Sequence, residues 1–235
     1  FVLNDSNESI MAIYTAVKDD CSAFMARMDA LTLQYLPLDK EARKVFYYEL
    51  RQQHAFDYQK WSTTDEAATL YFLMKTGFNG IWQINKNTDG RFGTPSGLLN
   101  QKDKVYDKDN VLEWEKALQH CTLMVGDFRE TLSAATPNSY VFLDPPYRGS
   151  FTQYGVDFDD GLQESVIKFL NDLTVKGAYV MMSNRDIGDG FFEARQGRND
   201  ITYFDVTYTA GRRKKNEDGT HSAKKAREIL MIGKK

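Results

Sequence analysis

The tetrapeptide Asp144-Pro145-Pro146-Tyr147 directly follows a short apolar run, Tyr140–Leu143. This run is typical of a buried β-strand, because turn-forming residues precede it and prolines follow it. Each proline fixes its own φ, and Pro146 restrains Pro145 to an extended conformation. The Asp144 carboxylate and the Pro145 carbonyl can therefore converge on one point beside the Tyr147 ring. In open α/β sheets, ligands bind at such carboxyl ends of strands.

This arrangement suits a planar group that carries an exocyclic amine. Such an amine is a weak nucleophile, because its lone pair is delocalised into the ring. Two acceptors on its N–H bonds hold the amine, increase the charge on nitrogen and orient the lone pair. The aromatic side chain can stack on the face of the ring. The alternative is a strand end followed by a Pro-Pro turn, with Asp144 as a turn acceptor and Tyr147 as a core residue.

The composition indicates an ordinary soluble globular chain, with 42% hydrophobic and 27% charged residues among 235. No apolar stretch reaches membrane-spanning length and no signal peptide is visible, so we expect a cytoplasmic protein that contacts no membrane. We also expect a monomer. Its two cysteines, Cys21 and Cys121, are far apart and are expected to be buried free thiols. The three histidines are scattered, which argues against a metal site.

Although the net charge is −3, the sequence contains a basic region near the C-terminus. It comprises Arg212, Arg213, Lys214, Lys215, Lys224, Lys225 and Arg227. A local basic patch matters more than total charge for binding phosphate groups, so this region predicts binding to nucleic acid. A solvated tail is the alternative.

The N-terminal segment predicts a strand over residues 1–5 that ends in Asp5, and Ser6-Asn7 can cap a helix with apolar spacing from Ile10 onward. In nucleotide-binding α/β folds, an acid at a strand end commonly accepts hydrogen bonds from ribose hydroxyls. The alternative for Asp5 is an acid that only favours the start of the helix.

Residues 20–108 show no strand alternation long enough for a sheet, and predict helices over 21–33, 40–53 and 65–75. Segment 77–97 then alternates apolar and polar residues from Ile81 to Asn85 and contains the turn sequence Thr88-Asp89-Gly90, which predicts a β-hairpin. Its many amide, aromatic and arginine side chains favour a binding face. A glycine-rich surface hairpin without a ligand is the alternative.

The remaining sequence predicts helices over 111–120 and 162–173, and strands over 123–128, 178–182, 201–209 and 228–232. Residues 148–160 are rich in small and polar side chains and are expected to form a loop over the site. Strand 123–128 ends in Asp127-Phe128, for which an N-cap and a core residue remain the alternative roles.

Taken together, these features resemble the Dam-type DNA adenine-N6 methyltransferases, whose DPPY motif matches Asp144–Tyr147. The resemblance implies a three-layer α/β, Rossmann-like methyltransferase sheet, mostly parallel with a closing antiparallel hairpin. It implies a catalytic domain of residues 1–19 and 109–235, and a mainly helical recognition insert of residues 20–108. It also implies S-adenosylmethionine as cofactor, double-stranded DNA as partner and no metal.

The same resemblance assigns the site residues. The catalytic residues would be Asp144, Pro145, Pro146 and Tyr147, and the cofactor residues Asp5, Ser6, Asp127, Phe128 and Asp144. The DNA-binding residues would be Phe78, Asn79, Gly80, Gln83, Asn85 and Arg91 in the hairpin, with Arg212, Arg213, Lys214 and Lys215.

The chain departs from this family pattern in two respects. No Gly-rich cofactor loop and no short Lys-containing motif precede Asp5, so we expect about 30 residues or more ahead of Phe1, or else an inactive truncated remnant. Gln83 stands where such enzymes typically have an Arg, which leaves GATC only as a default recognition site. An amino-methyltransferase that acts on RNA or on a protein glutamine is the other alternative.

Overall fold

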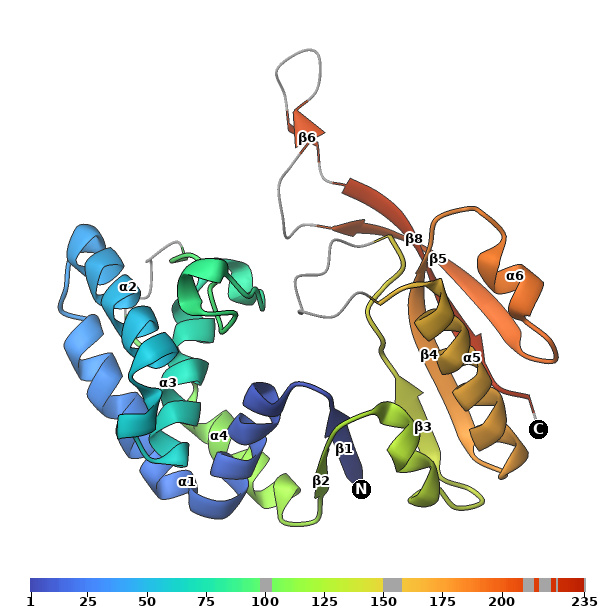
Figure 1. Cartoon of the computed structure of the whole chain (residues 1–235), viewed down its shortest axis with the longest axis horizontal. Helices are drawn as coiled ribbons and strands as arrows, with labels where there is room; N and C mark the ends of the chain where they lie inside the picture. Colours follow the sequence, from blue (N-terminus) through green and yellow to red (C-terminus); the bar gives the residue numbers. More distant parts are fainter. Residues whose placement is uncertain (98–102, 150–157, 209–213, 216–220, 223, 235) are drawn as a thin grey trace. The chain divides into compact units, whose positions relative to one another are not determined.

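The computed structural model describes residues 1–97, 103–149, 158–208, 214–215, 221–222 and 224–234 (Figure 1). They form two compact units, Phe1–Phe128 and the described residues from Arg129 onward, and each unit is described by itself. Helix α1 (Glu8–Tyr35) runs through residue 19, where the predicted catalytic domain meets the insert. No described helix combines the length and the apolar composition that a bilayer span requires.

The first unit contains a short parallel strand pair and four α-helices. Strand β1 (Val2–Asp5) pairs in parallel with β2 (Thr122–Val125). The helices are α1, α2 (Lys40–Phe56), α3 (Thr63–Thr76) and α4 (Lys108–Leu118), and the 3₁₀ turns are η1 (Tyr58–Lys60), η2 (Phe78–Gly80) and η3 (Lys86–Thr88). Helix α1 packs against α3 and α4 around buried aromatic side chains such as Phe24 and Phe72. The predicted helices and the first strand are therefore confirmed.

Helix α1 combines two predicted helices, which meet at a kink. Asn7 caps its start by accepting hydrogen bonds from the backbone N–H groups of Ser9 and Ile10. Asp20 is non-helical, with φ −150° and ψ 65°, and its carboxylate accepts from the Ala23 N–H at 3.0 Å. Asp20 thus acts as an internal N-cap, which explains why the pattern predicts a separate helix from residue 21.

Segment 77–97, hereafter called the recognition loop after its predicted role, turns back on itself without forming the β-ladder that its alternation predicts. Its antiparallel pairing is limited to two isolated bridges, Gly77 with Ser96 and Ile84 with Phe92. Other donors occupy carbonyls of the first limb. Thr94 Oγ1 donates to Ile81 O at 2.7 Å, and Asn85 O accepts within the turn from Thr88 Oγ1 at 2.9 Å and from the backbone N–H groups of Thr88 and Gly90 at 3.1 Å each. The prediction of a regular hairpin is therefore wrong, although the antiparallel return is present.

The recognition loop is fixed to helix α2. The Arg51 guanidinium donates to the carbonyls of Gly93 and Thr94 at 2.9 and 3.1 Å, and Tyr47 Oη donates to the Thr94 carbonyl at 2.9 Å. A Cβ on Gly93 would lie 2.2 Å from the Cβ of Asn85, so only glycine allows the two limbs to approach. Side chains of α2 thus hold the loop in place through its backbone.

The second unit contains a four-stranded sheet in the order β3-β4-β8-β5. Strand β3 (Tyr140–Leu143) pairs in parallel with β4 (Tyr179–Asp186), and β8 (Lys224–Ile232) lies antiparallel between β4 and β5 (Asp200–Tyr208). The remaining elements are η4 (Phe128–Ser133), α5 (Asp160–Val175), α6 (Phe191–Arg195), β6 (Lys214–Lys215) and β7 (His221–Ser222). The predicted closing antiparallel hairpin is confirmed.

Helix α5 covers one face of this sheet, with Val166, Ile167 and Leu170 in its core (Figure 1). On the other face, Tyr140 and Phe142 of β3 are 82% and 60% exposed, and Tyr140 stacks on Tyr179 at a centroid distance of 5.0 Å. Strand β3 is thus only half covered within its unit, whereas the apolar run predicts a fully buried strand. A continuous apolar run does not reveal whether a second layer belongs to the same unit.

His54 of α2 makes the stability of the first unit depend on pH. Its imidazole is 1% exposed, and neither ring nitrogen has a hydrogen-bond partner among the described residues. Burial, with a smaller contribution from Arg91, lowers the pKa of His54 to about 4. The unfolded chain, with a His pKa of about 6.5, therefore binds an extra proton between these two values.

We expect the free energy of unfolding to fall by about 3 kcal/mol through this residue as the pH drops from about 6.5 to about 4. The measurement is urea unfolding of the parent and of His54→Phe across this range. The parent should lose stability relative to the variant as the pH falls. Parallel curves for the two proteins would contradict this assignment.

Candidate active site

Asp144 is exposed at the carboxyl end of β3, next to strand β4. Leu143 pairs with Met182, which brings Ser183 beside the motif, and Ser183 Oγ donates a hydrogen bond to Asp144 Oδ1 at 2.5 Å. This hydrogen bond orients the carboxylate, whose oxygens can only accept when it is ionised. The sheet thus presents an oriented acceptor at its carboxyl edge.

Tyr147 is half-buried and its phenol remains protonated. Burial raises the pKa of Tyr147 above its usual range, and the nearby charges of Asp144 and Glu228 act in the same direction. The side chain therefore provides a neutral aromatic surface with a polar end.

Arg148 anchors the end of the motif. Its buried guanidinium pairs with Asp160 through two bonds of 2.8 Å, donates to Asp189 Oδ1 at 2.9 Å, and lies 3.8 Å from the centroid of the Phe191 ring. The Arg148 guanidinium lowers the pKa of both carboxyls, so both stay ionised at neutral pH. The motif is thereby tied to the first residue of α5 and to the segment before α6.

Two buried amides hold the backbone of the motif. Gln163 of α5 donates through Nε2 to the Pro146 carbonyl at 2.6 Å, and its Oε1 accepts from Asn184 Nδ2 at 2.9 Å. Asn184 Oδ1 in turn accepts from the backbone N–H of Arg148 at 3.0 Å and from that of Arg185 at 2.8 Å. Gln163 and Asn184 are 1% and 0% exposed, so this chain of hydrogen bonds lies inside the unit.

The first unit has a polar edge of its own, at the carboxyl ends of β1 and β2. Asp5 lies opposite Val125, and the Asp5 carbonyl accepts from the Gly126 N–H at 3.1 Å. Asp5 is exposed and its carboxylate accepts from the Asn7 N–H at 2.8 Å. The structure thus brings Asp5 and Ser6 to the same edge as Asp127 and Phe128.

The residues of the recognition loop that are predicted to bind DNA differ in their exposure and in their hydrogen bonds. Asn79 and Gly80 are exposed, and both have positive φ. Gln83 is half-buried, and its side chain forms no hydrogen bond with any other described residue. Asn85 Oδ1 accepts from the Asn87 N–H at 2.9 Å and so caps η3. The backbone N–H of Phe78 donates to Pro95 O.

Arg91 forms internal contacts. Its guanidinium pairs with Glu66 of α3 and lies 3.5 Å from the centroid of the Tyr58 ring. The Arg91 side chain therefore links the recognition loop to the helices behind it.

The basic C-terminal region is described only in part. Arg212 and Arg213 are outside them, and Lys214 and Lys215 are described only as the backbone of β6. Arg227 pairs with Asp186, which is 5% exposed, and lies 4.7 Å from the centroid of the Tyr203 ring. Arg227 is therefore bound within its own sheet.

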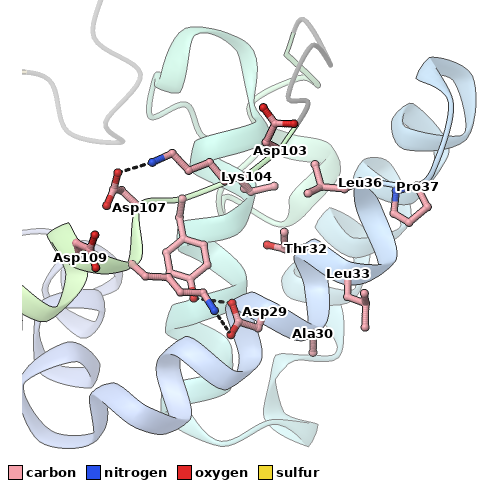
Figure 2. A pocket seen from close by; sticks show the side chains of 13 residues that line it. Asp29, Ala30, Thr32, Leu33, Leu36, Pro37, Asp103, Lys104, Asp107 and Asp109 are labelled. Atoms are coloured by element: carbon pink, nitrogen blue, oxygen red, sulfur yellow. Dashed lines mark hydrogen bonds and ion pairs between the residues drawn. The ribbon is translucent and has the colours of Figure 1, made fainter.

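A pocket of about 750 Å³ lies beside α1 in the first unit (Figure 2). Four aspartates and two lysines line this pocket. Both lysines are paired with aspartates, Lys104 with Asp107 at 2.5 Å and Lys108 with Asp29 at 2.6 Å, so the rim is acidic. None of the predicted site residues lines this pocket, and its acidic rim is unsuited to phosphate groups. In the described part of the chain, no group of three or more His, Cys, Asp and Glu side chains could hold a metal ion.

Comparison with known families identifies the chain. A family model described as "D12 class N6 adenine-specific DNA methyltransferase" matches residues 1–189. The chain belongs to this family. The predicted resemblance to Dam-type DNA adenine methyltransferases is therefore confirmed.

Several relatives carry names of the same kind. The type II methyltransferase M.MjaIII of Methanocaldococcus jannaschii is 32% identical over 84% of this chain and 70% of its own length. The retron Ec67 DNA adenine methylase of Escherichia coli is 29% identical over 79% of this chain and 62% of its own length. The DNA adenine methylase of Vibrio cholerae is 28% identical over 79% and 65%. The chain thus spans about two thirds of the relatives that it matches.

The residues at the β1–β2 edge fit the donor that methyltransferases of this class require. An exposed carboxylate at the carboxyl end of a parallel strand can accept from ribose hydroxyls, and Asp5 is placed in this way. An aromatic ring such as that of Phe128 can pack on an adenine face. The chemistry of this edge is thus compatible with a nucleoside cofactor.

Ser183, Gln163 and Asn184 are not among the functional residues predicted from the sequence. One signal for Gln163 was available, because it shares the helical spacing of Val166, Ile167 and Leu170 and so places an amide on an apolar face. A buried amide at such a position requires hydrogen-bond partners, and here the partners are the Pro146 carbonyl and the Asn184 amide.

Proposed function

We propose that this protein methylates N6 of adenine at specific sites in double-stranded DNA, with S-adenosylmethionine as the methyl donor. The observation that carries the proposal is the oriented Asp144 carboxylate at the carboxyl end of β3, followed by two prolines and an aromatic ring. Membership of the D12 class supports the reaction type.

In the proposed mechanism the target adenine leaves the duplex, because its amine is otherwise paired and out of reach. Asp144 and the Pro145 carbonyl accept hydrogen bonds from the two N–H groups of N6, and Tyr147 stacks on the base. These interactions increase the charge on N6 and aim its lone pair. One N6 proton is released to solvent as N6 takes up the methyl group. When bound, S-adenosylmethionine supplies an electrophilic methyl group, and Asp5, Ser6, Asp127 and Phe128 would hold its nucleoside part.

Direct transfer requires no covalent enzyme intermediate. The cysteines offer no candidate for one, since Cys21 and Cys121 are each 4% exposed. Burial raises the pKa of the Cys21 thiol to about 11, so this thiol stays protonated at neutral pH.

The proposal is tested by incubating the full-length protein with duplex DNA and a methyl-labelled donor. We expect the label in N6-methyladenine after digestion of the DNA to nucleosides. Label in RNA or in a protein glutamine side chain would contradict the proposal and assign the protein to another class of amino-methyltransferase. A folded protein that binds DNA and labels nothing would be a non-catalytic remnant.

We further propose that the basic region binds the DNA backbone. Replacement of Arg212, Arg213, Lys214 and Lys215 by glutamine should weaken binding to all sequences alike. It should also flatten the dependence of log K on log salt by about 0.9 for each phosphate that the variant no longer neutralises. Binding is measured by titration at several salt concentrations.

The control for this test is neutralisation of Lys116 and Lys168, exposed lysines that are paired within their own helices. It should change the slope less for each charge removed. A slope in the fourfold variant equal to that of the parent would assign the basic region to a solvated tail.

A further inference from the structure

We propose that Gln163 and Asn184 are positioning residues that fix the backbone at Tyr147, and with it the Cα–Cβ bond from which the Tyr147 ring projects. This inference rests on the proposed function and extends it to two side chains that touch neither base nor cofactor. Two peptide groups flank Tyr147, and each is bound by one of these two side chains.

The first of these peptide groups joins Pro146 to Tyr147, and Gln163 Nε2 binds its carbonyl at 2.6 Å. The second joins Tyr147 to Arg148, and Asn184 Oδ1 binds its N–H at 3.0 Å. The planes of these two groups determine φ and ψ of Tyr147, because each peptide group is rigid. With φ and ψ set, the direction of the Cα–Cβ bond is set as well.

The two amides also fix one another. Asn184 Nδ2 donates to Gln163 Oε1 at 2.9 Å, so the Gln163 amide must turn its nitrogen toward Pro146. The Asn184 amide must then turn its oxygen toward the N–H groups of Arg148 and Arg185. Neither amide can rotate without breaking several hydrogen bonds in a buried site, where they are not replaced by water.

Each end of this chain of hydrogen bonds is part of a rigid element. Gln163 lies in the first turn of α5, and Asn184 lies within β4, where it pairs with Ile229 of β8. Pro145 and Pro146 have fixed φ angles just before Tyr147, and the ion pairs of Arg148 hold the chain just after it. The point from which the Tyr147 ring projects is thereby fixed before any base arrives.

The test compares Gln163→Met with a matched control, Asn199→Leu. The first variant keeps side-chain length and removes the donor to Pro146. The control removes another buried amide of the same unit, 3% exposed, which donates to Asn171 at 2.9 Å. In Gln163→Met we expect the single-turnover rate of methyl transfer to fall by about 10- to 100-fold while the Kd for DNA stays unchanged. Both variants should melt at a lower temperature, and only the control should keep the parental rate.

A second readout does not depend on turnover. With 2-aminopurine at the target position, fluorescence reports how the extruded base stacks, and Gln163→Met should change this signal whereas Asn199→Leu should not. If Gln163→Met fails to fold, Asn184→Asp serves instead, since its carboxylate still accepts from Arg148 and Arg185 but cannot donate to Gln163.

Parental rate and fluorescence in a folded Gln163→Met or Asn184→Asp variant would overturn this inference. The activity of Asp144→Ala shows whether such a result refutes only the positioning role or the proposed function as well. An inactive Asp144→Ala beside a fully active Gln163→Met refutes only the positioning role. An active Asp144→Ala refutes the proposed function itself.

Discussion

Replacement of Asp144 by alanine in the full-length protein is expected to abolish methylation while leaving the fold intact. Removal of a single preorganised electrostatic partner at a reacting centre typically costs about 10²- to 10³-fold in rate. Here the missing carboxylate would also leave the base amine held by one acceptor only. Because Asp144 is exposed, its removal should barely change the melting temperature.

The matched control is Asp144→Asn, which keeps the size of the side chain and one acceptor oxygen but removes the charge. It should retain more activity than the alanine variant. Methyl transfer is measured in single turnover with saturating DNA, so that binding and chemistry are separated. Near-parental turnover in Asp144→Ala would show that the tetrapeptide is only a strand end and a turn.

Gln83→Arg is expected to change the DNA sequence that is methylated. An Arg fork pairs with O6 and N7 of guanine in the major groove, whereas a Gln amide pairs with N6 and N7 of adenine. The Gln83 side chain is not engaged by any other described residue, so its amide can meet a base edge without breaking an internal hydrogen bond. The exchange should alter discrimination at one base pair by roughly 1–3 kcal/mol.

The measurement is genome-wide sequencing of methylated adenines in cells that express the parent or the variant. The Gln83→Arg protein should require a guanine at one position where the parent does not. Arg91→Lys is a useful comparison, because the structure pairs Arg91 with Glu66 and its replacement should weaken the loop rather than redirect it. The same motif with the same strictness in the parent and in Gln83→Arg would exclude Gln83 as a base reader.

Much of the fold could be predicted from local sequence. The two prolines after Tyr140–Leu143, the Asn7 cap and the apolar spacing of α2, α3 and α5 are signals that act over a few residues, and the elements form where these signals stand. The predicted start of a separate helix at residue 21 has the same kind of local cause, because Asp20 caps the following turn within α1.

The predictions of structure that are wrong fail because of interactions between residues that are distant in sequence. Arg51 and Tyr47 fix the recognition loop from more than 40 residues away, and Thr94 captures a carbonyl 13 positions earlier, so alternation alone predicts a ladder that does not form. Likewise, the pairing of Arg91 with Glu66 cannot be read from local sequence, because Glu66 lies 25 positions earlier in the chain.

The way in which the recognition loop is held has a consequence for how such enzymes diversify. Helix α2 holds the loop through the carbonyls of Gly93 and Thr94, which every sequence possesses, and not through the side chains at positions 79 and 83. Mutation can therefore exchange the side chains at these two positions one at a time while the scaffold persists. Under the proposed role of Gln83 as a base reader, specificity could be re-engineered without loss of the fold.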